Sequence, residues 1–162
     1  MAFEKAYDFL ARRGYGDRVR TFSVSSATVE LAANALGTEP ARIAKSLTFV
    51  DGEGAIMVVC AGDMKVNSGK FKQRFGVKAK MLTFDQVHLL IGYDVGGVCP
   101  FGVNPSAAVY LDESLKRFEH VYPACGSDNS AVKLTPEELE QLTGAAWVDV
   151  CVPMAGAAES EK

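Results

Sequence analysis

A run of eleven residues from Gly92 to Gly102 contains four glycines and one proline. Glycine loses more backbone freedom on folding than other residues, so this cluster predicts a loop that turns sharply or approaches a partner closely. Two successive amides at Gly96 and Gly97 can point into one concavity, the geometry that binds an anion or the oxyanion of ester hydrolysis. Pro100 stiffens the end of the loop. A tight connection between two strands is the alternative interpretation.

Lys45 is the second candidate, within the segment Ile43-Ala-Lys-Ser-Leu-Thr-Phe49. If this segment is a strand, Lys45 shares one face with Leu47 and Phe49, which we expect to point to the core. Because an ammonium is costly to bury without a partner, Lys45 either extends to the sheet edge or serves as a fixed cation. A fixed cation would hold a phosphate or polarise an ester carbonyl.

Cys99 is a candidate nucleophile, although the sequence brings no base to it. A cysteine hydrolase needs a histidine base and a third group that orients the base. Of the two histidines, His88 lies in a predicted apolar helix, and neither it nor His120 is expected beside Cys99. Free cysteine is also a common small core residue, so a nucleophilic Cys99 is the minor interpretation.

Positive charge is concentrated between residues 65 and 80. This segment holds six basic and no acidic residues, whereas the whole chain carries a net charge of −3. A local basic patch on an acidic protein can hold a phosphate backbone while the rest of the surface limits nonspecific binding. The alternative is a solvated helix face.

Length and composition indicate one cytoplasmic domain. The chain has 162 residues, of which 48% are apolar, and no apolar run approaches the ~20 residues that a membrane span needs. The N-terminus has no signal-peptide pattern. The four cysteines form no C-x-x-C pair, which favours reduced thiols over a zinc site or a disulfide framework. We expect a domain over residues 1–153 and a frayed tail over residues 154–162.

Caps and breakers divide the chain into short helices and strands. Ser25 and Ser26 are predicted to cap one helix, Asn67 or Ser68 a second and Thr83 a third, and Thr135-Pro-Glu-Glu138 has the form of a capping box. The fold predicted from this order is α+β, a single domain with a curved, mostly antiparallel mixed sheet that is barrel-like and flanked by short helices. Helices are expected over residues 3–13, 27–36, 68–75, 83–92 and 135–144, and strands over 19–24, 45–50, 55–61, 80–82, 109–111, 121–124, 130–134 and 147–152.

Several segments, taken in order, resemble the YbaK-type aminoacyl-tRNA deacylase family, which is related to the editing domain inserted in bacterial prolyl-tRNA synthetases. The resemblance extends from about Ser25 to Val152, and the ordered set is specific although each segment alone is weak. The segments are Ser26-Ala-Thr-Val-Glu30, Ala35-Leu-Gly37, Ile43-Ala-Lys-Ser-Leu47, the run from Gly92 to Gly102, Val109-Tyr-Leu-Asp-Glu113, Gly126-Ser-Asp-Asn129 and Leu134-Thr-Pro-Glu-Glu-Leu139.

The resemblance implies hydrolysis of the ester between a wrong amino acid and the 3′ end of a tRNA, often the tRNA for proline, with no metal and no cofactor. Lys45 matches the essential lysine of the family and, with Gly96 and Gly97, is the expected catalytic set. The expected substrate-binding residues come from the glycine loop, a second pocket loop and the flanking motifs: Thr28, Ser46, Cys99, Pro100, Phe101, Gly102, Gly126, Ser127 and Asn129. Basic residues expected to guide the acceptor stem are Lys65, Lys70, Lys72 and Arg74.

The implied partner is the aminoacylated acceptor end of a tRNA, with a synthetase partner left open and neither DNA nor a membrane expected. Position 99 departs from the family, because serine or proline is usual there, and this affects the expected pocket size and preferred amino acid. Two alternatives remain at this point: a noncatalytic module that binds a tRNA 3′ end or a small ligand, and a hydrolase that depends on Cys99.

Overall fold

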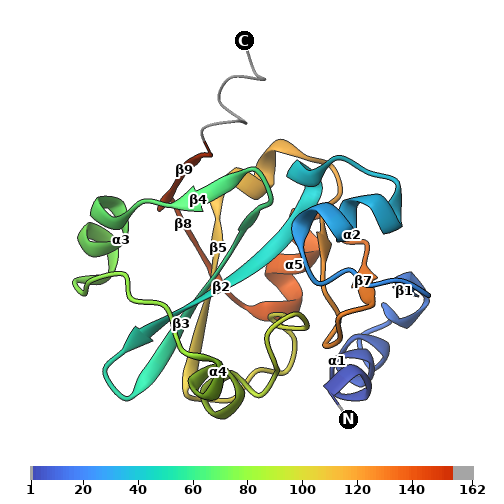
Figure 1. Ribbon diagram of the computed structural model, residues 1–162, viewed down its shortest axis with the longest axis horizontal. Coiled ribbons are helices and arrows are strands. Elements are labelled where there is room, and N and C mark those ends of the chain that lie inside the picture. The colour runs from blue at the N-terminus through green and yellow to red at the C-terminus, as the bar shows by residue number, and fades with distance from the viewer. Residues whose placement is uncertain (1, 155–162) are drawn as a thin grey trace.

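The computed structural model describes residues 2–154 and contains a curled, half-barrel sheet of five strands in the order β6-β2-β3-β5-β8 (Figure 1). Two short strand pairs, β1 with β7 and β4 with β9, lie beside this main sheet. The strands are β1 (Val19–Thr21), β2 (Ile43–Asp51), β3 (Gly54–Ala61), β4 (Met64–Val66), β5 (Ala107–Asp112), β6 (Tyr122–Pro123), β7 (Ser130–Val132), β8 (Ala146–Val148) and β9 (Cys151–Pro153).

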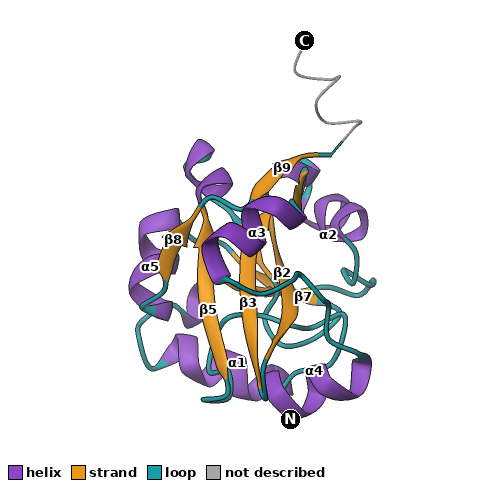
Figure 2. Cartoon of the chain, turned by 90° about the vertical axis from the view of Figure 1, so that its left-hand side faces the viewer, coloured by secondary structure: helices purple, strands orange, loops and turns teal. Residues whose placement is uncertain are grey.

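The central strand β3 is buried on both faces and divides the core into two layers. Met57 and Val59 point to one layer, and Ile56 and Val58 to the other, as the period of two along a strand requires. Helices α1 (Ala2–Ala11), α4 (Phe84–Ile91) and α5 (Pro136–Thr143) cover the first layer, while α3 (Ser68–Phe75) covers the second through Phe71. Figure 2 shows α3 in front of the strands β5, β3 and β2, with α1 and α4 at the lower end of the sheet.

The helices are α1 (Ala2–Ala11), α2 (Val29–Leu36), α3 (Ser68–Phe75), α4 (Phe84–Ile91) and α5 (Pro136–Thr143). Caps at Asn67, Thr83 and Thr135 are confirmed, the last two as capping boxes. The predicted cap at Ser25 and Ser26 is wrong, because Thr28 Oγ1 accepts the hydrogen bond from the Leu31 amide. None of the helices in the described part of the chain is long and apolar enough to span a bilayer.

The α+β class and the curved mixed sheet are confirmed, but the main sheet is less antiparallel than expected. Only β2 and β3 are antiparallel neighbours, whereas the other three pairings are parallel. The reason is the connections: β2 and β3 are joined by a tight hairpin, while the paths from β3 to β5 and from β5 to β8 contain helices, and parallel strands require such long crossovers.

Two predicted strands also differ in extent. The strand expected over 147–152 is divided, because β8 pairs with β5 whereas β9 pairs with β4. At the break, the Val150 amide donates to the buried carboxylate of Asp112 at 2.9 Å. The strand expected over 80–82 is reduced to a single bridge between Met81 and Phe49. At the C-terminus the Met154 amide still donates to the Asp63 carbonyl, and the rest of the predicted tail lies outside the described residues.

Candidate functional site

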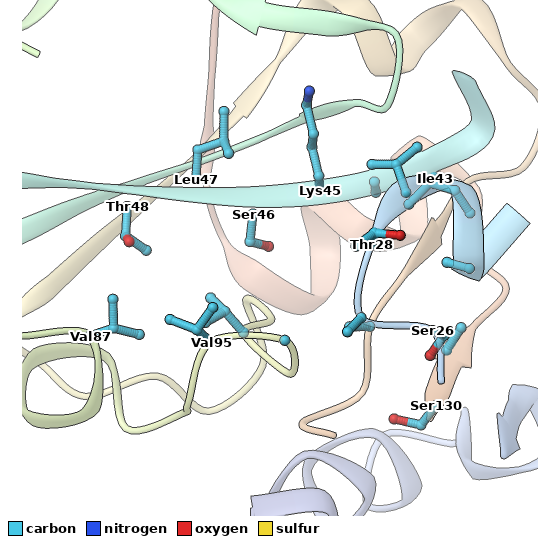
Figure 3. A pocket seen from close by; sticks show the side chains of 18 of the residues that line it. Ser26, Thr28, Ile43, Lys45, Ser46, Leu47, Thr48, Val87, Val95 and Ser130 are labelled. Atoms are coloured by element: carbon cyan, nitrogen blue, oxygen red, sulfur yellow. The ribbon is translucent and has the colours of Figure 1, made fainter. Parts of the chain in front are cut away.

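A cavity of about 320 Å³ lies between β2, the start of α2, α4 and the glycine loop (Figure 3). Its walls are mainly apolar, with Ile43, Leu82 and Val87 among them. Among the residues described, Lys45 is the single charged residue in the lining and no carboxylate takes part. Such a cavity, apolar with a few converging polar groups, is the usual form of a small-molecule site.

The cavity exists because β2 lacks a neighbouring strand along part of its outer edge. Strand β6 covers that edge only at Ile43 and Ala44. Further along, the Thr48 carbonyl accepts from the Leu82 amide at 3.1 Å, and the Val50 amide donates to the Lys80 carbonyl at 2.8 Å. Thr48 and Val50 thus direct their backbone N–H and C=O groups to the outer edge of β2, and so does every second residue of the strand. The N–H and C=O of Ser46 therefore face the open stretch between β6 and the segment 80–82.

Two serine hydroxyls in this cavity lack hydrogen-bond partners. Ser26 Oγ and Ser46 Oγ are both buried, and within residues 2–154 they are the only buried side-chain nitrogen or oxygen atoms without a partner. Both residues line the cavity. A buried hydroxyl left without a hydrogen bond costs about 1–3 kcal/mol, so a water or a ligand is expected to bond to these two atoms.

The side chain of Lys45 leaves β2 on the opposite face from Ser46 and Thr48. In Figure 3, Lys45 extends on the same side as Leu47, whereas Ser46 and Thr48 point toward Val95 and the α4 region. The Lys45 ammonium is 3.9 Å from Met154 Sδ. The ammonium therefore extends away from the side of β2 that carries Ser46 and Thr48, although Lys45 is part of the cavity lining.

Gly96 and Gly97 occupy different environments. Gly96 lines the cavity and has a φ of +100°, a backbone conformation that other residues rarely adopt. The Gly97 amide donates to the Asp94 carbonyl at 3.0 Å, so it is already used within the turn. A Cβ at Gly97 would lie 2.7 Å from the Ser127 nitrogen. The expectation of two cooperating amides is therefore corrected: Gly97 allows the two loops to approach each other, and only Gly96 faces the cavity.

Cys99 and Phe101 are fully buried and do not line the cavity. Burial raises the pKa of the Cys99 thiol to about 11, although hydrogen bonds from the Phe101 backbone and from Tyr93 act in the opposite direction. A thiol with this pKa is almost entirely protonated at neutral pH. The structure therefore argues against Cys99 as a nucleophile.

The remaining predicted substrate residues lie around the cavity rather than in its wall. Pro100 and Gly102 line a separate cavity of about 380 Å³ beside α1 and α5. Gly126 packs against the Ala2 carbonyl, where a Cβ would lie at 2.5 Å. Ser127 bonds to Asn129 at 2.9 Å and to Ser130 at 2.7 Å, which holds the second loop together.

The basic residues lie on β4 and α3, which cover the same face of the sheet as the Lys45 side chain. Lys65, Lys72 and Arg74 are exposed. Lys70 is paired with Asp149 at 3.0 Å. The Arg74 guanidinium stacks over the Phe75 and Tyr110 rings, which leaves its edge accessible to a phosphate.

Some lining residues were absent from the sequence prediction. The sequence predicts Ser26 as a helix cap and as part of a family segment, but not as a cavity residue. Thr48 follows Ser46 by two positions, so the period of a strand could have identified it. Ser130 also lines the cavity. No signal in the sequence indicated Ser130. Within the described residues, no three His, Cys, Asp or Glu side chains gather as a metal site requires.

Comparison with known proteins agrees with the resemblance. Residues 24–142 match the family model of the aminoacyl-tRNA editing domain. The chain is 51% identical to the uncharacterized protein YwhH of Bacillus subtilis, over 82% of this chain and 86% of that protein. It is 31% identical to the proline–tRNA ligase of Thermotoga neapolitana over 56% of this chain, but over only 16% of the ligase.

A solved structure of a protein described as a candidate trans-editing enzyme for prolyl tRNA synthetase superposes with a TM-score of 0.84 at 34% identity. The match covers 92% of this chain and 96% of the other. The matched family segment contains β2, the start of α2, α4 and the glycine loop, between which the cavity lies. The chain therefore belongs to the aminoacyl-tRNA editing domain family.

Proposed function

We propose that the protein is a deacylase that hydrolyses the ester between an incorrect amino acid and the 3′ end of a tRNA, with a tRNA for proline as the first candidate. The observation that carries this proposal is the cavity itself. Segments far apart in the sequence meet there: Thr28 from the start of α2, Lys45 and Ser46 from β2, and Gly96 from the glycine loop.

The acyl group is proposed to enter the cavity, with its carbonyl near the open edge of β2. Water attacks the carbonyl carbon, the bond to the ribose oxygen breaks, and the products are the free amino acid and the tRNA. An aminoacyl ester is already activated, so orientation and stabilisation of the oxyanion can supply much of the rate enhancement. We assign the amides of Ser46 and Gly96, two residues of the cavity lining, as the donors to that oxyanion.

Lys45 is proposed to act at the entrance. Lys45 belongs to the cavity lining, and its ammonium is 3.9 Å from the thioether sulfur of Met154. A lysine is a point charge on a flexible stem and can turn toward a phosphate without an exact geometry. It would hold the terminal phosphate while the acyl group occupies the cavity.

The two orphan hydroxyls support an amino acid whose side chain is uncharged and can form hydrogen bonds. Ser26 Oγ and Ser46 Oγ can each donate to or accept from a ligand. An acyl group with a carboxylate or ammonium side chain would lose its hydration without a charged partner in the wall, which is costly. Activity on aminoacyl-tRNA would place the protein in the cytoplasm, where translation occurs.

The test is to measure deacylation of a panel of mischarged tRNAs, with tRNA for proline carrying small uncharged amino acids tested first. Lys45→Ala should lower kcat/KM roughly 10- to 150-fold, the loss expected when a hydrogen bond to a charged group, worth about 1.5–3 kcal/mol, is removed. The exposed Lys133→Ala is the matched control and should retain activity. Tight tRNA binding without ester loss for every substrate would identify a binding module instead, and full activity of Lys45→Ala would refute its role.

A further inference from the structure

Three large apolar side chains at the cavity are exposed to solvent. Met81 is 58% exposed, Phe84 75% and Val95 53%, yet all three also line the cavity. We call these three residues the apolar rim. They come from the segment before α4, from the first residue of α4 and from the glycine loop. The rim therefore continues the apolar wall of the cavity outward into solvent.

Phe84 is exposed because the core ends before the first turn of α4, and not because Phe84 lies on the solvent-facing side of the helix. Val87 and Ile91, three and seven positions later, are buried, so Phe84 lies on the core-facing side of α4. At the first turn of α4, however, little of the protein covers that side. An aromatic ring at a core-facing position without a cover, next to a cavity, indicates a binding surface.

The proposed substrate supplies a fitting occupant. If the acyl group occupies the cavity, the ribose to which it is esterified stands at the mouth, and the attached terminal base lies just outside. That base belongs to a single-stranded end, so it can stack on an aromatic ring. The nearby positive charges suit a nucleotide phosphate, because Lys45 belongs to the cavity lining and the exposed Lys78 and Lys80 precede Met81 in the chain.

Acidic residues near the rim do not oppose this placement. Asp85 and Asp94 are exposed, but neither lines the cavity. Asp94, which precedes Val95 in the glycine loop, is paired with His88 of α4 at 2.8 Å. The phosphate on the 5′ side of the terminal nucleoside can therefore approach the lysines without meeting a carboxylate in the cavity lining.

We propose that the apolar rim is the platform for the terminal adenine of the tRNA, with the Phe84 ring stacked on the base and Met81 and Val95 packed at its edges. The proposal rests on the proposed function for the identity of the substrate. It assigns Phe84 as a substrate-positioning residue that does not take part in the chemical step.

The test uses a tRNA whose terminal adenine is replaced by 2-aminopurine, whose fluorescence is quenched on stacking. Titration with the wild-type protein should quench the signal, and Phe84→Ala should weaken binding by roughly 5- to 150-fold, the range for loss of one base–aromatic stack. Phe84→Trp should restore both quenching and affinity. Leu89→Ala is the matched control, because Leu89 is 71% exposed on the same helix but does not line the cavity.

Phe84→Ala should fold like the wild type, because a side chain as exposed as that of Phe84 contributes little to the core. Equal quenching by Phe84→Ala and the wild type, or no quenching by the wild type, would overturn the platform. The measurement needs no ester hydrolysis. Deacylation without quenching would support the proposed function and contradict the platform. Quenching without deacylation would support the platform and contradict the proposed function.

Discussion

Replacement of Gly97 by alanine is expected to separate the two loops behind the cavity. A Cβ at position 97 would lie 2.7 Å from the Ser127 nitrogen and 2.8 Å from the carbonyl carbon of Gly126. Both contacts are to backbone, which cannot rotate away as a side chain can. To reach an ordinary contact distance of at least 3.4 Å, one loop must move as a whole.

The expected cost is about 1–3 kcal/mol, the typical penalty for inserting a methyl group into a tightly packed region. The value should fall in the upper half of that range, because two backbone atoms are involved. In a chain of this length, each 1 kcal/mol lowers Tm by roughly 2–4 °C. Because Gly96 and the second loop meet at the cavity wall, deacylation should fall as well.

Denaturation in urea, followed by circular dichroism, measures the loss, and an unchanged m-value would show that only stability has changed. Gly144→Ala is the matched control. Gly144 has a φ of +65° and nothing within 4 Å of its Cβ position, so it isolates the cost of the backbone conformation, about 1–2 kcal/mol. If Gly97→Ala were as stable as the wild type while Gly144→Ala lost stability, the close-approach argument would fail.

Three further outcomes are expected. Cys99→Ser should retain deacylation, and Cys99 should react slowly with iodoacetamide in the folded protein at pH 8, because burial raises the pKa of the thiol to about 11. Mass spectrometry of the labelled cysteines measures the reaction, and rapid labelling with loss of activity would support Cys99 as the nucleophile. Ser26→Ala should leave stability unchanged or slightly raised, because it removes an orphan hydroxyl, yet lower kcat/KM several-fold; reduced stability would indicate a hidden partner. Burial raises the pKa of Glu138, but hydrogen bonds from Arg18 and from the Thr135 backbone lower it overall, below its ordinary value of 4.5. The charge of Glu138 therefore stabilises the fold at neutral pH, and this contribution is lost as the pH falls through the folded pKa. Glu138→Gln should cost up to ~1 kcal/mol at pH 7 and progressively less at acidic pH, measured by urea denaturation across this range.

Local chemistry made the helices predictable. Thr83 and Thr135 each precede a helix and have a Gln or Glu three positions later, and these capping boxes are formed. The hairpin of β2 and β3 around Asp51–Gly54 was predictable for the same reason, because a turn signal separates two apolar runs. Such signals act within a few residues, so they depend little on the rest of the fold.

Strand direction was less predictable, because it depends on where a connection crosses the sheet. The strand expected over 109–111 is present within β5, but nothing near it specifies that it runs parallel to β3. The two partners are separated by β4, α3, α4 and the glycine loop. Their pairing is decided by how these elements pack, which no local pattern records.

The sequence by itself determined that Lys45, Ser46 and a glycine-rich loop could belong to one site, since residue type and the order of the motifs suffice for that expectation. Only the tertiary structure decided what each residue does there. Within the glycine loop, Gly96 faces the cavity whereas Gly97 packs against Ser127. The sequence alone cannot assign different roles to two adjacent glycines. Their roles differ because, in the folded protein, a segment distant in the sequence packs against Gly97 and not in the same way against Gly96.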